Sequence, residues 1–167
     1  MTAGIEAPTS IHSDRQETAG YLKIVTLIER LHRQLLDLLK AGLEAAGETE
    51  VNNVQALLLY NIADAEMTAG ELRSRGHYHG SNVSYNLKKL VDSGYIHHER
   101  SVSDRRSVRV RLTPRGHEIR NIVCGVLDTH KSQLSHSDIL DADGLARLNQ
   151  LLSALEGFWH SQLTGAS

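Results

Sequence analysis

The spacing of apolar residues in this chain of 167 residues predicts long helices at both of its ends. Between residues 19 and 46, apolar side chains recur every three or four positions, which places them on one face of a helix. They are Tyr21, Ile24, Ile28, Leu31, Leu35 and Leu38. We expect this helix to end at Gly47. Residues 1–18 contain Pro8 and show no sustained period, so we expect them to form a flexible arm.

Two further helices with the same spacing are predicted at the C-terminal end. Thr113 and Pro114 supply the N-cap residue and first-turn proline that start a helix, and Ser137 or Asp141 can start the next one. Their apolar faces comprise Ile119, Ile122, Val123, Val126, Leu127 and Leu134, and then Leu145, Leu148, Leu152, Leu155, Trp159 and Leu163. A single domain cannot cover three such faces, so we expect a symmetric homodimer. The alternative is a monomer whose terminal helices cover each other.

Two short helices are predicted in the first half of the intervening segment. Residues 51–63 form the first, with an inward face made by Val54, Leu57, Leu58 and Ile62. Thr68 and Glu71 then have the spacing of a capping box, in which each side chain binds the other residue's backbone N–H. The capping box predicts a second helix that ends near Gly76.

A third short helix, over residues 81–90, has a polar outer face. Its apolar stripe consists of Val83, Leu87 and Leu90. Ser81 or Asn82 can cap its first turn, and Gly94 can end it in a left-handed conformation. The outer face also carries Ser84, Tyr85, Lys88 and Lys89.

An alternating stretch follows, and it predicts antiparallel strands over residues 95–100 and 107–112. One face carries Val108, Val110 and Leu112, and the other carries Arg109 and Arg111. The connection between the strands has no tight-turn signal, so we expect a projecting loop, and long loops in compact domains are often functional. An arginine at its tip can enter a narrow minor groove, and Asp104 can orient Arg105 or Arg106. A polar helix followed by an arginine-tipped hairpin is the layout of a DNA-binding winged helix-turn-helix.

Positive charge is concentrated in the same part of the chain. The whole chain has a net charge of −2. Between Gly70 and His117, ten lysines and arginines accompany four acidic residues, a balance of +6 that leaves −8 for the remainder. A concentrated basic segment is what binding to nucleic acid requires, whereas an evenly solvated surface does not predict one.

These residues resemble the MarR family of winged helix-turn-helix transcriptional regulators. The similarity rests on the 81–90 helix, on the run from Asp92 to Ile96, and on the stretch from Asp104 to Gly116, which reads D-x-R and then V-x-V-x-L-T-x-x-G. The family implies a mainly α-helical fold with a small β-wing, and a homodimer with one reading helix per subunit in the major groove. It places the wing arginine, Arg106 here, in the minor groove. It also implies a cleft for a small aromatic or phenolic effector between the dimerisation helices and the DNA-binding region.

We therefore expect one domain, with a flexible arm over residues 1–18, a helical dimerisation region over residues 19–46 and 117–163, and a winged helix-turn-helix over residues 51–116. The expected DNA-binding residues are His79, Ser81, Asn82, Ser84, Tyr85, Lys88, Lys89, Asp104, Arg105 and Arg106. The short or planar side chains among them suit base edges, and the lysines suit phosphates. The expected function is that of a ligand-responsive repressor on a near-palindromic operator.

Other functions remain open at this stage. A winged-helix protein–protein interaction module is one, although it would expose apolar anchors where this chain is basic. A metal-sensing regulator is another, because the chain has ten histidines. However, His97 and His98 face opposite sides of a strand, and His77 and His79 have no cysteine cluster beside them, so we expect these histidines near phosphate or solvent. A redox-sensing regulator would depend on Cys124, which we expect to be a small residue near the dimer core.

The sequence argues against an enzyme and against a membrane protein. It contains no nucleophile motif, phosphate-binding loop or paired carboxylates, so we expect neither catalysis nor a cofactor. No apolar run approaches the length of a membrane span, and no signal-peptide pattern opens the chain. The expected location is the cytoplasm.

Overall fold

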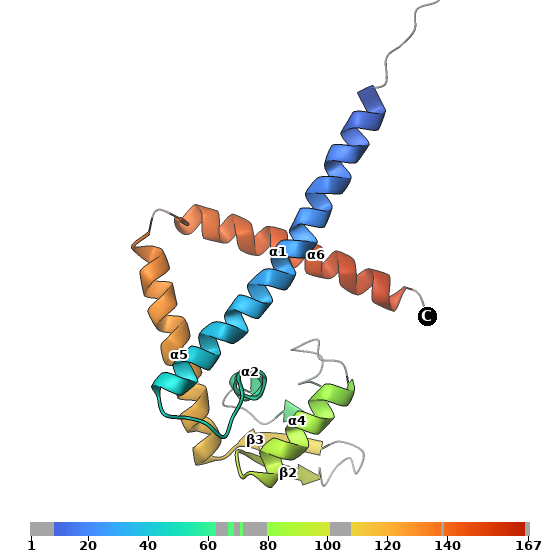
Figure 1. The fold of residues 1–167 in the computed structure, drawn as a ribbon. Helices are drawn as coiled ribbons and strands as arrows, with labels where there is room; N and C mark the ends of the chain where they lie inside the picture. Colours follow the sequence, from blue (N-terminus) through green and yellow to red (C-terminus); the bar gives the residue numbers. More distant parts are fainter. Residues whose placement is uncertain are drawn as a thin grey trace, which may run out of the picture. The chain divides into compact units, whose positions relative to one another are not determined.

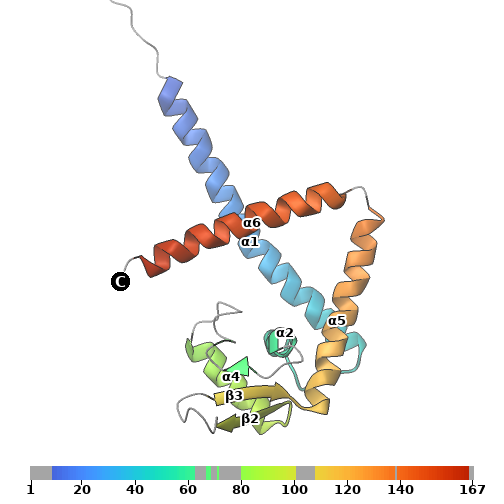
Figure 2. The ribbon, with the colours of Figure 1, turned by 180° about the vertical axis from the view of Figure 1, so that it is seen from behind.

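The computed structural model, shown from two sides in Figures 1 and 2, describes residues 9–62, 67–68, 71, 80–100, 108–137 and 139–165. Within these ranges, residues 9–15, 67, 80–83, 100 and 108 are described by their backbone alone. The chain divides into two compact units, Met1–Val123 and Cys124–Ser167. The first unit contains the sheet and the helices packed on it, and it therefore holds the candidate site.

The first helix, α1, spans Thr9–Ala45, so it begins ten residues earlier than the sequence pattern indicated. The expectation of a flexible arm is wrong for residues 9–18. This stretch contains neither proline nor glycine, and once a helix is nucleated each further residue is added at little cost. The predicted end at Gly47 is confirmed. Its φ is 76°, and the N–H of Glu48 reaches back to the carbonyl of Leu43 at 2.9 Å, as in a Schellman cap.

The second helix, α2, spans Asn53–Ile62 and begins two residues later than expected. A reciprocal capping box sets this start: Asn52 Oδ1 accepts from the N–H of Gln55 at 2.9 Å, and Gln55 Oε1 accepts from the N–H of Asn52 at 3.1 Å. The inward placement of Val54 is wrong, because its side chain is 38% exposed. The buried face is centred between Gln55 and Leu59, about 120° around the helix from Val54.

A three-stranded antiparallel sheet follows, with strand order β1-β3-β2. The predicted ribbon is confirmed as β2 (Ile96–Arg100) and β3 (Val108–Leu112). Val110 and Leu112 point into the core, and Arg109 and Arg111 point outward, as the alternation predicted. The third strand, β1 (Met67–Thr68), pairs with the other edge of β3 and was not expected. Two residues are too few to show an alternating pattern.

Helix α4 spans Gly80–Asp92 and ends in a second Schellman cap. Gly94 has φ 79°, and the N–H of Tyr95 bonds to the carbonyl of Leu90 at 2.8 Å. The capping box of Thr68 and Glu71 is confirmed by two bonds, of 2.6 and 3.0 Å. The rest of the helix predicted to end near Gly76 lies outside the described residues.

The last two helices are α5 (Pro114–Ser135), into which β3 leads directly (Figure 2), and α6 (Ala142–Thr164). Thr113 caps α5, as predicted, by accepting from the N–H of Gly116 at 3.1 Å. Asp141 caps α6 by accepting from the N–H of Gly144 at 2.7 Å. No residue of α6 is buried, and none of the described helices is long and apolar enough to span a bilayer.

The core of the first unit lies where α2 packs on β3, α4 packs on β2 and α1 packs on α2. Its largest fully buried side chains are Leu39, Leu58, Leu59, Ile62, Leu90, Tyr95 and Val123. These residues come from both long and short elements, so α4 and the ribbon are held on one shared core.

Candidate nucleic-acid interface

Helix α4 presents a polar face to solvent, as its sequence predicted. Ser84, Tyr85, Lys88 and Lys89 are exposed, whereas Leu87 is half-buried and Leu90 is buried. The ammonium group of Lys89 lies 5.4 Å from the centre of the Tyr85 ring, one helical turn away. This cation–π contact keeps an aromatic ring and a positive charge together on the outer face.

The expected site residues outside this part of α4 are only partly visible. Ser81 and Asn82 lie in the first turn of the helix, where the backbone alone is described. His79 and the wing-tip residues Asp104, Arg105 and Arg106 lie outside the described residues. Of the expected DNA-binding residues, those whose side chains the structure places together on the outer face of α4 are Ser84, Tyr85, Lys88 and Lys89.

The outer face of the ribbon carries charged side chains of both signs. Arg111 pairs with Glu99 across the two strands at 3.7 Å, and both side chains are largely exposed. His97 lies opposite Arg111 and His98 lies opposite Val110, so the two histidines face opposite sides, as predicted. Among the described residues, no three histidine, cysteine, aspartate or glutamate side chains are grouped closely enough to hold a metal ion. Cys124, on α5, is a half-buried free thiol.

The C-terminal end of α4 is tied to the start of α5 by Thr113. Its hydroxyl donates to the carbonyl of Gly94 at 2.7 Å, and its N–H donates to the carbonyl of Tyr95 at 3.1 Å. These are carbonyls that follow the last turn of α4, where the helix itself supplies no donor. The L-T-x-x-G part of the sequence motif thus fixes the C-terminal end of α4 to the start of α5.

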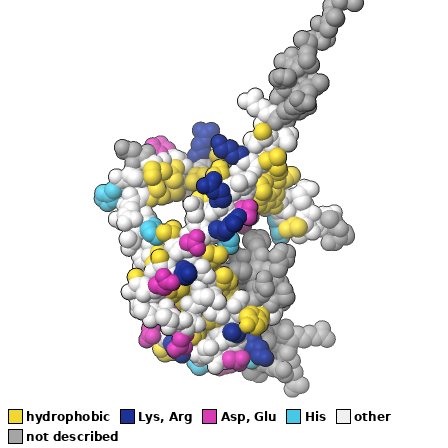
Figure 3. Space-filling view, in the orientation of Figure 1, with side chains coloured by type: hydrophobic (Ala, Val, Ile, Leu, Met, Phe, Trp, Pro, Cys, Tyr) yellow, Lys and Arg dark blue, Asp and Glu magenta, His cyan; other side chains and the backbone are white. Residues whose placement is uncertain are grey.

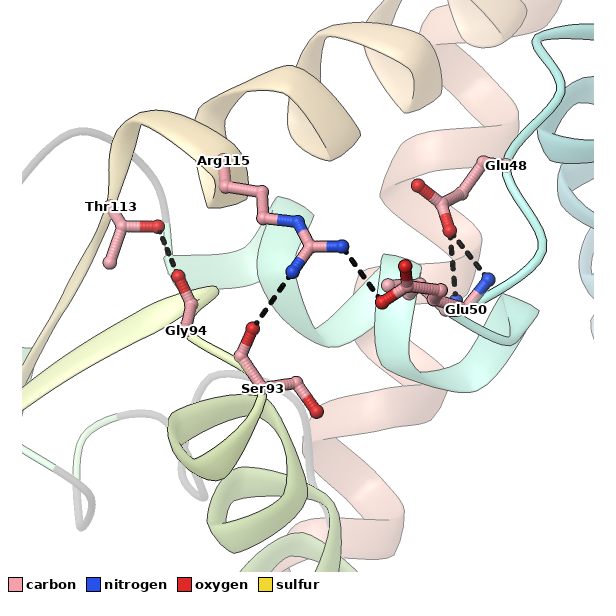
Figure 4. Close-up of polar contacts among 7 residues, drawn as sticks. Glu48, Glu50, Ser93, Gly94, Thr113 and Arg115 are labelled. Atoms are coloured by element: carbon pink, nitrogen blue, oxygen red, sulfur yellow. Dashed lines mark hydrogen bonds and ion pairs between the residues drawn. The ribbon is translucent and has the colours of Figure 1, made fainter.

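Arg115 makes a second connection to the same end of α4, shown in Figure 4. Its guanidinium donates to the carbonyl of Ser93 at 3.1 Å and to a carboxylate oxygen of Glu50 at 2.7 Å. It also lies 4.4 Å from the centre of the Tyr95 ring. The hydrogen bond to Glu50 raises the pKa of Arg115 above its ordinary value, so this group carries its full charge.

Tyr95 is buried beneath this cluster, with 1% of its surface exposed. Burial raises the pKa of its phenol above 10.0, and the carboxylate of Glu48 raises it further, because both disfavour the phenolate. Glu48 in turn accepts from the backbone N–H groups of Glu50 and Val51, at 2.6 and 3.2 Å, and so orders the loop before α2.

A cleft of about 790 Å³ lies between the end of α1, the loop before α2 and the end of α4. Its charged lining residues are Asp37, Lys40, Glu44, Glu48, Glu50 and Lys89. Four carboxylates and two ammonium groups make this lining acidic.

Comparison with known proteins is consistent with this geometry. A sequence profile of the winged helix DNA-binding domain matches residues 51–116. The chain is also 35% identical over 156 residues to the exopolysaccharide II synthesis transcriptional activator ExpG of Rhizobium meliloti, covering 93% of this chain and 80% of that protein.

Two solved structures share the fold. A variant of MarR from E. coli in complex with operator DNA has a TM-score of 0.65 and 24% identity, covering 81% of this chain and 95% of that one. FabT from Streptococcus pneumoniae in complex with DNA has a TM-score of 0.67 and 20% identity, covering 85% and 99%. The chain belongs to the MarR family of winged helix-turn-helix transcriptional regulators.

In this MarR-family protein, Glu50 was not expected among the functional residues, and Arg115 was expected only to add to the positive charge of the basic segment. The two residues are 65 positions apart, and neither belongs to a local pattern that would pair them. Arg115 contacts the carboxylate of Glu50, which lies outside the stretch from Gly70 to His117, so part of the basic balance counted from the sequence is compensated within the first unit.

Proposed function

We propose that this regulator binds double-stranded DNA sequence-specifically, in the cytoplasm, as a homodimer. The observation that carries the proposal is the exposed face of α4, on which Ser84, Tyr85, Lys88 and Lys89 stand clear of the core. A helix of this kind fits the major groove, where side chains can reach base edges and phosphates.

The proposed contacts divide by chemistry. Ser81, Asn82, Ser84 and Tyr85 read base edges or nearby phosphates, while Lys88, Lys89 and His79 contact phosphate. Arg105 and Arg106 extend from the wing toward the minor groove, and Asp104 orients one of them. Phosphate contacts position the protein, and base contacts give the specificity.

The proposed dimer rests on apolar side chains that the single chain leaves exposed, several of them visible along α1 in Figure 3. On α1 these include Tyr21, Leu22, Ile24, Val25, Leu27, Leu31 and Leu38, and on α6 they include Leu145, Leu148, Leu151, Leu152, Phe158 and Leu163. Exposed apolar surface repeated along whole helices marks an interaction site. A second copy of the chain, related by two-fold symmetry, is the simplest cover.

We place the effector site in the cleft between α1 and α4. Its acidic lining disfavours an anionic aromatic acid and favours an uncharged phenol, whose hydroxyl can donate to Glu44, Glu48 or Asp37. A ligand bound there would contact both the dimerisation helix α1 and the end of the reading helix.

The proposed DNA binding is compatible with both repression and activation of transcription. The resemblance to the MarR family favours a repressor, which blocks transcription from an operator that overlaps the promoter. The 35% identity to a protein named as a transcriptional activator favours activation from an operator placed upstream. A reporter gene carrying the operator, with and without the protein, separates the two by the sign of its response.

Selection of bound duplexes from a random DNA pool tests the DNA-binding function. We expect a near-palindrome whose half-site centres lie about 10 base pairs apart, because a two-fold dimer presents its two reading helices about one DNA turn apart. Recovery of no preferred sequence would count against specific binding, and an enriched site without dyad symmetry against the dimer geometry. Repeating the selection with phenols and aromatic acids tests the effector.

A further inference from the structure

Arg115 connects two segments that lie far apart in the chain. One is the loop before α2, where Glu50 is held by the hydrogen bond from its N–H to Glu48. The other is the end of α4, where Ser93 offers a carbonyl that the helix does not use. Because the guanidinium is planar and carries several donors in fixed directions, it can serve both partners at once.

Building on the proposed DNA binding, we infer that Arg115, anchored by Glu50, is a positioning residue that sets the angle at which α4 enters the major groove. The end of α4 is already held by two other attachments, the buried Leu90 and the bond from Thr113 to Gly94. A third attachment restricts rotation of the helix about the first two.

The length of α4 makes this angle important for recognition. Ser93 and Ser81 are twelve residues apart in sequence, or about 18 Å along a helix axis. A tilt of about 5° at Ser93 moves the first turn by about 1.6 Å over that length. Recognition sites need their side chains held within about 0.5 Å, so a small rotation at the end of α4 disturbs base contacts at its start.

Removing the negative charge of Glu50 tests the positioning role of Arg115. Removing a carboxylate from a DNA-binding protein normally strengthens binding to any DNA, because the phosphates then meet less negative charge. The positioning role predicts the opposite for the preferred sequence. The probes are the duplex recovered by the selection described above and an unrelated duplex of equal length, titrated with the full-length protein by fluorescence anisotropy over a salt series.

Glu50→Gln and Arg115→Met are each expected to weaken binding to the selected duplex by about tenfold, comparable to one impaired base contact. Binding of Glu50→Gln to the unrelated duplex should be as tight as that of the wild type or tighter, because only a negative charge is lost. The salt slope on the selected duplex should be unchanged for both variants. Arg115→Lys should give an intermediate loss of affinity, since an ammonium group keeps the positive charge but cannot donate to both partners in the fixed directions of the guanidinium. Glu29→Gln is the matched control: it removes the same charge from an exposed carboxylate paired with Arg33, and should bind at least as tightly as the wild type.

The inference would be overturned if Glu50→Gln bound the selected duplex as tightly as the wild type or more tightly. So would an equal loss on both duplexes for Arg115→Met with a salt slope shallower by about one unit, because that result makes Arg115 a direct phosphate contact. If Arg115→Met does not fold, the exposed Glu50 decides the matter alone. Failure of the wild type to select any sequence would instead refute the proposed function.

Discussion

A β-carbon placed on Gly116 would lie 2.2 Å from the carbonyl oxygen of Tyr95. The first turn of α5 therefore approaches the backbone of the segment joining α4 to β2 more closely than any side chain permits. The same two segments are joined by the hydrogen bonds of Thr113. The glycine of the L-T-x-x-G pattern is thus required by a packing distance within the DNA-binding unit.

Gly116→Ala is expected to destabilise the protein by about 1–3 kcal/mol, because the added methyl group must push the backbone of Tyr95 away. Gly125→Ala, on the same helix, is the matched control. Nothing lies within 4 Å of its added carbon, so it should stabilise by about 0.5–1 kcal/mol through helix propensity. Urea unfolding at one fixed protein concentration measures both, and equal effects of the two substitutions would contradict the packing argument.

The buried phenol of Tyr95 makes stability depend on alkaline pH. Its pKa is raised in the folded state, so the unfolded chain loses this proton first, and the stabilisation present below pH 10 is lost as the pH rises through the folded pKa. Tyr95→Phe should show a smaller loss of unfolding free energy between neutral pH and about pH 11. Urea unfolding over this range measures the difference, and identical alkaline losses in both proteins would show that the phenol is not the responsible group.

The exposed apolar face of α6, which includes Leu148 and Leu152, predicts a dimer that dissociates when charged residues are introduced there. Light scattering of the wild type at micromolar concentration should give twice the mass of one chain. Leu148→Glu combined with Leu152→Glu should give the mass of one chain, because glutamate opposes burial of this face. Gln150→Glu lies about 180° around the helix from that face and should remain dimeric. A wild-type protein that is monomeric with its helices intact would refute the proposed assembly.

Lys89 and Asn82 should affect DNA binding in different ways. Lys89→Ala should weaken binding to all sequences alike and reduce the salt slope by about one unit, as expected for a phosphate contact. Asn82→Ala should change the preferred base at one position per half-site, at a cost of about 1–3 kcal/mol. Binding titrations over a salt series and a repeated selection measure these effects. A uniform loss for Asn82→Ala would make that residue a positioning contact.

The proposed wing contact is tested at Arg106. Arg106→Ala should weaken operator binding by about 1–3 kcal/mol, because the guanidinium is proposed to enter the minor groove. Its thermal unfolding should match that of the wild type. Arg147→Ala, on the exposed surface of α6, is a control that removes the same charge. Unchanged affinity with reduced stability for Arg106→Ala would mean that this arginine is a structural residue.

Much of the first unit could be predicted because its boundaries are set by local chemistry. The capping box of Thr68 and Glu71, the cap at Thr113 and the left-handed glycine at position 94 each involve residues within a few positions of one another. The alternation of β3 likewise separates Val110 from Arg111 without any knowledge of the rest of the fold.

The missed features depend on partners far away in the chain or on patterns too short to recognise. β1 is a strand because β3 offers it an edge, and Met67 and Thr68 carry no signal of their own. The exposure of Val54 follows from the way α2 is rotated against its neighbours. Glu50 and Arg115 meet only after the sheet has brought the start of α5 back to the loop before α2.

Thr68 belongs to two structures at once, since it pairs with Arg109 in β3 and caps the turn at Glu71. The strand that leads out of the wing and the entry to the helix-turn-helix therefore share one residue. Under the proposed function, a displacement of the strand that leads out of the wing is therefore transmitted through Thr68 to the entry of the helix-turn-helix.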